Sequence, residues 1–173
     1  MTKDKELKSG FKFETSILLL ISFVIVLLDQ LSKFLSDKSL NYGEPVQVFP
    51  GFDLLLAYNH GAAFSFLSDA GGWQRWFLIS ISLSISLVIL IWLVRLPKTQ
   101  KLMALSLMFI LAGAVGNLYD RVVFGYVIDF ISIYYGEYRF ATFNIADSAV
   151  SVGAALMMVD IFQGEPKVSK IES

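Results

Sequence analysis

Residues 76–94 read WFLISISLSISLVILIWLV and contain no charged side chain. A helix needs about 20 predominantly apolar residues to cross the hydrocarbon core of a bilayer, and this stretch is long enough. Its alternating serines resemble a strand pattern, but a lone strand in lipid would leave its backbone polar groups without hydrogen-bond partners. The segment therefore predicts a transmembrane helix.

Three other apolar segments have a similar length, at about residues 17–35, 102–119 and 145–162. The chain of 173 residues is 55% hydrophobic and only 17% charged, more apolar surface than a soluble domain of this size can bury. We therefore expect one integral membrane domain over residues 1–173. The first segment follows a basic start without a small-x-small cleavage site, which indicates an uncleaved anchor.

Small residues recur four positions apart within the spans, as suits close helix packing. The pairs are Ser80/Ser84, Ser82/Ser86, Ala112/Gly116 and Ala149/Gly153. They predict a compact bundle, with Trp73 and Trp76 as interfacial anchors of the second span.

The two connections at about residues 36–75 and 120–144 contain β-favouring, aromatic runs, one of them around a Pro-Gly turn. The face that holds both tails and the connection at residues 95–101 carries nine lysines and arginines, against five on the opposite face. This asymmetry predicts cytoplasmic termini. The predicted fold is a mainly α membrane protein: a four-transmembrane-helix bundle with a small β layer on the outer side.

The composition limits the kinds of catalytic and metal-binding groups that the chain can use. The chain has no cysteine, which excludes disulfides, thiolate catalysis and Cys-based zinc sites, and it has a single histidine, His60, in a loop. A metal site or a Ser-His-Asp triad is therefore not expected, and no cofactor is implied. The net charge of −1 and the lack of a basic tail give no indication of nucleic-acid binding. Carboxylates, amides and a few basic groups remain.

Such groups collect at the outer ends of three spans and in the loop between the last two. They are Asp29, Gln30 and Lys33, then Asn117, Asp120 and Arg121, then Asp129, Asn144 and Asp147. Several have purely structural interpretations. Asn144 and Asp147 have the spacing of a helix cap, Asp29 and Lys33 that of an i,i+4 ion pair, and Asp120 with Arg121 could form a surface pair. Four acids in other contexts are expected to be solvated: Asp53, Asp69, Glu137 and Asp160.

Asp129 resists a structural interpretation, because its neighbours are apolar and no turn or adjacent opposite charge accompanies it. Two carboxylates held in a poorly solvated cleft share a proton, so that one activates water while the other polarises a carbonyl. Asp129 and Asp147 are the candidate pair, and the helix start favours ionisation of Asp147 first. Asn117, Asn144 and Arg121 could support them, and Asn59 and Gly61 could clamp a ligand.

Four motifs carry a resemblance to a known family: LDQLSK, NHGAAFSF, GAVGNLYDRVVFGYVIDF and FNIADSA. Together they make the chain similar to the bacterial lipoprotein signal peptidases (signal peptidase II) over about residues 16–163. The resemblance implies an aspartic endopeptidase of the inner membrane that cleaves diacylglyceryl-modified prolipoproteins just before the lipidated cysteine. Asp129 and Asp147 would be catalytic, with an active site at the outer face.

The resemblance also implies that Asn59, Asn117, Arg121 and Asn144 contact substrate or shape the site. Asp29 and Asp120 would be supporting residues. The cyclic peptide globomycin would occupy the substrate site, membrane lipids would surround the bundle, and nothing demands more than a monomer. A small transporter or proton relay also carries intramembrane acids, although no internal duplication supports it. A noncatalytic scaffold, with Asp147 only a cap, is a third interpretation.

Overall fold

The computed structural model describes residues 3–61 and 72–163, with side chains from residue 16 onward. Its helices are α1 (Lys3–Ser39), α2 (Trp73–Arg95), α3 (Lys101–Val123) and α4 (Ile145–Gln163). In each helix the described residues include a segment long and apolar enough to cross a membrane. The predicted four-helix architecture is confirmed.

The helices extend past the predicted spans, because backbone hydrogen bonding continues through polar residues that hydropathy leaves out. At its end α3 runs to Val123 and so places Asp120 and Arg121 on the helix instead of in the connection predicted at about residues 120–144. The last turn of α3 therefore delivers polar side chains from a rigid element.

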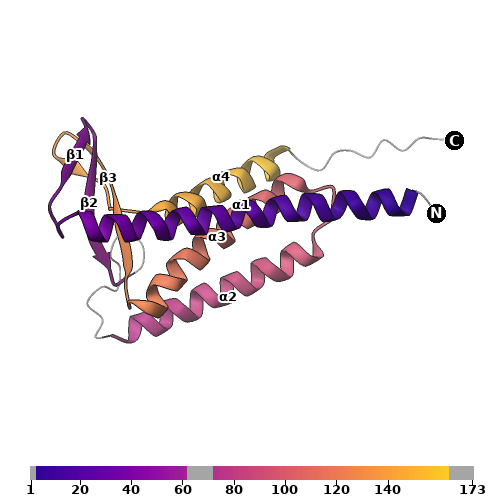
Figure 1. Cartoon of the computed structure of the whole chain (residues 1–173), viewed down its shortest axis with the longest axis horizontal. Coiled ribbons are helices and arrows are strands. Elements are labelled where there is room, and N and C mark those ends of the chain that lie inside the picture. Colours follow the sequence, from indigo (N-terminus) through magenta and orange to yellow (C-terminus); the bar gives the residue numbers. More distant parts are fainter. Residues whose placement is uncertain (1–2, 62–71, 164–173) are drawn as a thin grey trace.

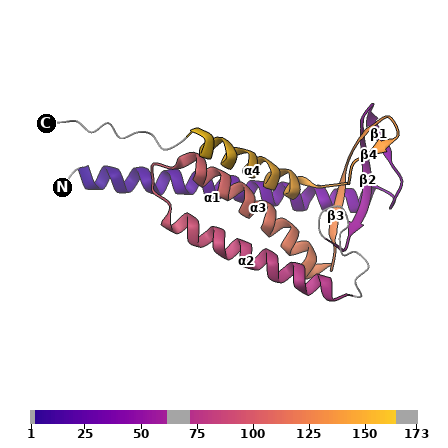
Figure 2. The ribbon, with the colours of Figure 1, turned by 180° about the vertical axis from the view of Figure 1, so that it is seen from behind.

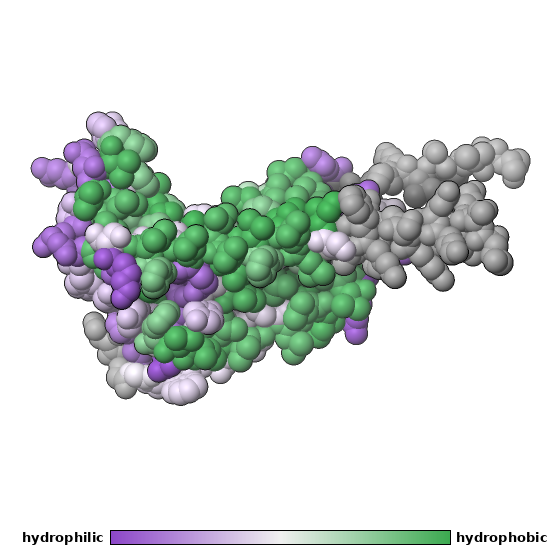
Figure 3. All heavy atoms as spheres, in the orientation of Figure 1, coloured by the Kyte–Doolittle hydropathy of each residue, from purple (hydrophilic) through white to green (hydrophobic). Residues whose placement is uncertain are grey.

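The bundle is built around α3. Helices α1, α2 and α4 all pack against α3, and α4 makes the most extensive contact. Figures 1 and 2 show the four helices running roughly side by side, with the sheet across one end. The first described turn of α1 and the last of α4 lie at the opposite end. The described surface of the helices in Figure 3 is mostly hydrophobic, and hydrophilic residues concentrate toward the sheet.

Helix α4 approaches α3 closely because glycines line the contact. A Cβ on Gly113 would collide with the carbonyl oxygen of Ala146, and one on Gly153 would lie 2.7 Å from the carbonyl oxygen of Ser106. Ala112 and Ala149 are also buried. The small-residue prediction is confirmed for α3 and α4.

For α2 the prediction is half wrong. Ser80 and Ser84 are exposed and donate to backbone carbonyls of their own helix. Ser86 is buried, in line with Leu78 and Ile89 on the stripe that α2 turns inward. Only one of the two serine pairs therefore lies on the packed side of α2, because this helix contacts the bundle along a single face.

The predicted β layer is an antiparallel sheet in the order β1 (Val46–Phe49), β2 (Phe52–Asn59), β3 (Val127–Tyr135) and β4 (Tyr138–Arg139). The Pro-Gly turn joins β1 to β2, with Gly51 at φ 92° as only glycine readily accepts. In the β2–β3 register Ala57 lies opposite Asp129, and Asn59 opposite Val127. Side chains two apart share a face, so Asn59 and Asp129 lie on the same side of the sheet.

Candidate active site

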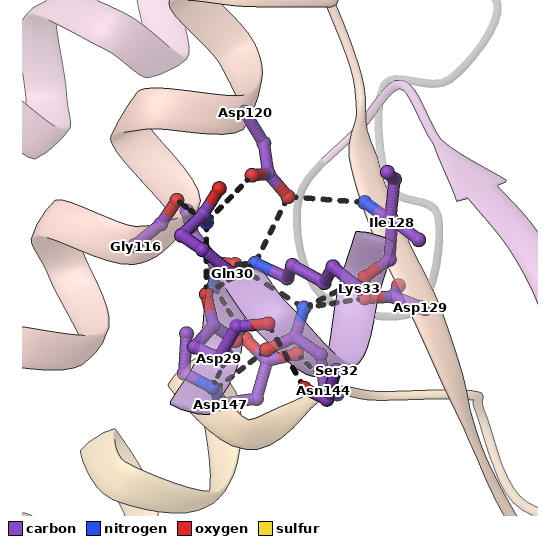
Figure 4. A network of polar contacts seen from close by, with 12 residues as sticks. Asp29, Gln30, Ser32, Lys33, Gly116, Asp120, Ile128, Asp129, Asn144 and Asp147 are labelled. Carbon is purple, nitrogen blue, oxygen red and sulfur yellow. Dashed lines mark hydrogen bonds and ion pairs between the residues drawn. The ribbon is translucent and has the colours of Figure 1, made fainter. Parts of the chain in front are cut away.

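The polar groups predicted from three spans and two loops meet where the sheet covers the bundle (Figure 4). Helix α1 contributes Asp29 and Lys33, the end of α3 contributes Asn117, Asp120 and Arg121, and β2 ends at Asn59. Asp129 comes from β3, and Asn144 and Asp147 stand at the start of α4. Elements far apart in sequence therefore build one network.

Asp147 is a helix cap, as the local interpretation proposed. Its backbone N–H donates to Oδ1 of Asn144 at 2.9 Å, and its Oδ2 accepts from the backbone N–H of Asn144 at 3.2 Å. This reciprocal pair is a capping box, which satisfies backbone groups that a helix start would leave open. The second oxygen, Oδ1, accepts from Nδ2 of Asn117 at 2.7 Å. Asp147 therefore joins α4 to α3 as well.

Asp129 is 2% exposed and is held by two amides. Its Oδ1 accepts from Nδ2 of Asn144 at 2.7 Å, and its Oδ2 accepts from Nδ2 of Asn59 at 3.2 Å. Burial and the nearby charge of Asp147 raise the pKa of the Asp129 carboxyl to about 7, although the two amide donors act in the opposite direction. Near neutral pH this carboxyl can both hold and release a proton.

Asn144 connects the two carboxyl groups and is itself fully buried. Its side-chain N–H groups face Asp129, while its side-chain oxygen and backbone N–H bond to Asp147. One residue therefore fixes Asp129 relative to Asp147, through its buried side-chain amide and its own backbone N–H. Such preorganisation is what proton-transfer chemistry requires of its groups.

Beneath the pair, Lys33 is 1% exposed and lies between two buried carboxylates. Its Nζ is 2.8 Å from Asp29 Oδ2 and 2.9 Å from Asp120 Oδ2. The predicted Asp29–Lys33 pair is confirmed, but the surface pair of Asp120 with Arg121 is wrong. Asp120 is fully buried, and it faces α1 because α3 continues as a helix at this point.

The lysine also orients an amide of the site. Oδ1 of Asn117 accepts from Lys33 Nζ at 3.0 Å and from Asn144 Nδ2 at 3.2 Å. Because these two donors occupy the oxygen, the Nδ2 of Asn117 is turned toward Asp147. Asp29 in turn accepts from the backbone N–H of Ala146 at 2.8 Å, so that α1 also holds the first turn of α4.

Arg121 lies at the edge of the network. Its Nη2 donates to the carbonyl oxygen of Gly61 at 3.0 Å, and Gly61 N–H donates to Oδ1 of Asn59 at 3.0 Å. Its Nε is buried without a hydrogen-bond partner among the described residues. One donor of this guanidinium, near the charges of Asp147 and Asp129, is therefore unsatisfied within the described part of the chain. The rest of the NHGAAFSF motif, residues 62–66, lies outside the described residues.

Sequence reasoning missed an ion pair on the sheet. Asp53 was expected to be solvated, yet it is 3% exposed and bonds to Nη2 of Arg139 at 2.7 Å. Arg139 also donates to Ser132, which pairs with Asp53 across β2 and β3. Only the strand register could have indicated this contact. Glu137 is exposed and Asp160 half-buried, while Asp69 lies outside the described residues.

His60 is exposed, with its ring centroid 5.3 Å from that of Tyr126. This aromatic contact is on the strand side of the site, next to Asn59. In the part of the chain that the structure describes, no group of three or more histidine, aspartate or glutamate side chains is arranged to hold a metal ion.

Comparison with known proteins points to one family. Residues 21–163 match the model of a family described as signal peptidase (SPase) II. A lipoprotein signal peptidase of Pseudoalteromonas translucida (strain TAC 125) is 48% identical over 151 residues, covering 87% of this chain and 91% of that protein. Another, from Alteromonas mediterranea, is 47% identical over 163 residues, covering 94% and 87%.

Two solved structures have the same fold. Both are described as bacterial membrane enzymes determined by the in meso method, at 2.3 and 1.9 Å resolution. The first has a TM-score of 0.80 at 27% identity and covers 91% of this chain and 94% of its own. The second has a TM-score of 0.76 at 28% identity, with 86% and 94% covered.

Proposed function

The chain belongs to the signal peptidase II family, and from this premise we propose that Asp129 and Asp147 are its catalytic pair. The protein is a lipoprotein signal peptidase, a membrane aspartic peptidase of bacteria with several spans. The observation that carries the proposal is that Asn144 bonds to both carboxyl groups and so holds them together at a buried site.

The two carboxyl groups divide the work of peptide hydrolysis. Asp147, ionised and supported by donors from Asn117 and Asn144, takes a proton from water as the water oxygen attacks the scissile carbonyl carbon. Asp129, whose pKa is raised to about 7, donates its proton to the carbonyl oxygen. The proton on Asp147 then passes to the leaving nitrogen as the C–N bond breaks, and Asp129 recovers its proton from the collapsing hydroxyl.

The substrate is a prolipoprotein that already carries a diacylglyceryl group on its cysteine, and cleavage occurs just before that cysteine. The lipid keeps the substrate in the bilayer, so its scissile bond stays at one height. Figure 1 shows the sheet at one end of the bundle, and the candidate site lies where the two meet, which supports cleavage at one such height. We propose that four residues hold the substrate backbone: Arg121, whose Nε has no partner among the described residues, and Asn59, Gly61 and Asn117.

The catalytic test compares Asp129→Asn and Asp147→Asn with the wild-type enzyme, purified in detergent and supplied with a lipid-modified prolipoprotein. Each variant keeps the shape of the side chain but cannot exchange a proton, so we expect turnover to fall by about a thousandfold. Asp160→Asn is the matched control, because it changes an acid at the far end of α4. Near-normal turnover in either dyad variant would rule out the pair.

We further propose that both termini are cytoplasmic and that the site lies at the outer face, in keeping with the distribution of basic residues. The chain lacks cysteine, so single introduced cysteines report sidedness. Glu137→Cys on the sheet should react with an impermeant maleimide added to intact spheroplasts, and Lys98→Cys, between α2 and α3, should react only after permeabilisation. The reverse pattern would overturn the orientation.

Globomycin is proposed to occupy the same site in a monomeric enzyme. It should then raise the melting temperature of the wild-type protein and compete with substrate. If globomycin binds the wild-type enzyme without competing with substrate, the inhibitor must bind at another site.

A further inference from the structure

The last turn of α3 has backbone carbonyls that the helix cannot satisfy. The helix closes with Phe124 N–H and Gly125 N–H both donating to the carbonyl oxygen of Asp120, at 2.7 and 3.2 Å. Gly125 has φ 90°, the left-handed conformation typical of a residue that follows a helix. The carbonyls of Arg121 and Val122 come later in this turn and have no helical N–H ahead of them.

Arg75, in the first turn of α2, supplies the missing donors. Its Nε donates to the carbonyl oxygen of Arg121 at 2.9 Å, and its Nη2 donates to that of Val122 at 2.8 Å. The guanidinium also lies against Gly125, where a Cβ would come within 3.3 Å of Nη1. A planar fork on two successive carbonyls, with a positive charge at the helix C-terminus, fixes the position of this turn.

The turn that Arg75 holds is the one that carries the site. The side chain of Arg121 leaves this turn to reach Gly61, and Oδ2 of Asp120 accepts from the backbone N–H of Ile128 at 3.2 Å. Asp129 is the next residue of β3. Among the described residues, Arg75 bonds to the backbone of Arg121 and to none of the side chains that we place in the reaction. Any effect of Arg75 on the reaction is therefore indirect, through the position of this turn.

We propose that Arg75 is a positioning residue of the peptidase, which fixes the backbone of Arg121 so that its guanidinium faces the substrate. This inference rests on the proposed role of Arg121 as a substrate contact. It predicts an effect mainly on substrate binding, because Arg75 bonds to the backbone of a proposed binding residue and not to Asp129 or Asp147.

A double-mutant cycle with Arg75→Gln and Arg121→Gln tests the inference, with kcat and KM measured separately. We expect Arg75→Gln alone to lower kcat/KM about tenfold, chiefly through KM, and to have an effect of about twofold or less when Arg121→Gln is already present. Arg75→Lys keeps the charge and the packed stem but not the fork, so it should recover little of the loss and remains measurable if the glutamine variant unfolds.

Arg95→Gln, at the other end of α2, is the matched control and should leave both kinetic constants unchanged. Equal losses from Arg75→Gln in both backgrounds would show a general structural role and overturn the inference, as would wild-type kinetics in Arg75→Lys or Arg121→Gln. A wrong assignment of the catalytic pair can be told apart from this outcome. It would appear as near-normal turnover by Asp129→Asn, while the coupling between Arg75→Gln and Arg121→Gln would stay as expected.

Discussion

The side-chain amide of Asn144 donates to Asp129 at 2.7 Å, although the two residues belong to different elements, and the same asparagine caps α4 in partnership with Asp147. One side chain therefore performs a structural task and aligns a candidate catalytic group. The two tasks use different atoms of the amide, Oδ1 for the cap and Nδ2 for Asp129, and substitutions can separate them.

Asn144→Ser should separate capping from alignment. Serine is as good an N-cap as asparagine, so the cap of α4 should be kept, but it has no amide N–H groups for Asp129, Asn117 and the carbonyl oxygen of Ile128. We expect turnover to fall about a hundredfold, because the carboxyl of Asp129 loses its closest donor. Asn144→Ala should be less stable than the serine variant by about 1 kcal/mol, because it also loses the cap. Equal turnover in the serine variant and the wild type would contradict the aligning role.

The pH dependence of kcat/KM should reveal the proton on Asp129. Because the pKa of this carboxyl is raised to about 7, it holds its proton below that pH and loses it above. The proposed mechanism needs the protonated form, so kcat/KM should decline above pH about 7, approaching tenfold per pH unit. A rate that rises continuously through this range would indicate that Asp129 acts in its ionised form.

Lys33→Met should destabilise the protein strongly. The methionine leaves Asp29 and Asp120 as buried carboxylates without their cation, a loss of about 3–5 kcal/mol in the free energy of unfolding. Thermal unfolding in detergent measures it, with Lys38→Met, an exposed lysine of the same helix, as the control. Similar melting temperatures for the two variants would show that the buried charges are balanced in another way.

Gly113→Ala should disturb both packing and activity. The added methyl group would meet the backbone of Ala146, so α4 must move away from α3, at a cost of about 1–3 kcal/mol. Since Asn144 and Asp147 stand on either side of Ala146, turnover should fall too. Ala154→Leu adds a larger group on the exposed face of α4 and serves as the control. An unaffected Gly113→Ala variant would mean that the helices have room to adjust.

Much of the fold could be predicted because its causes are local in the sequence. Length and hydropathy identify the four spans, and the turn at Pro50 and Gly51 identifies the strands. Contacts within one turn of helix, such as Asp29 with Lys33 and Asn144 with Asp147, are likewise readable from their spacing. The motifs that match a known family placed Asp129 and Asp147 together as a candidate pair.

Other contacts depend on which faces of the helices and strands pack together. Asp53 and Asp120 were expected near solvent, but a strand register brings Arg139 to one, and the packing of α1 on α3 brings Lys33 to the other. The order of residues contains no local signal for either contact, because each joins segments more than eighty positions apart.

The sequence by itself therefore determined the membrane spans, the strand-forming loops and the inventory of chemical groups, since apolar length and short-range spacing act wherever the chain lies. Only the tertiary structure decided which donors each buried carboxylate receives. The close approach of α3 and α4 at glycines, and the sheet across their ends, give Asn144 its partners. The packing of α1 and α2 on α3 gives Lys33 and Arg75 theirs. A buried polar group must find such partners, and packing determines which ones are within reach.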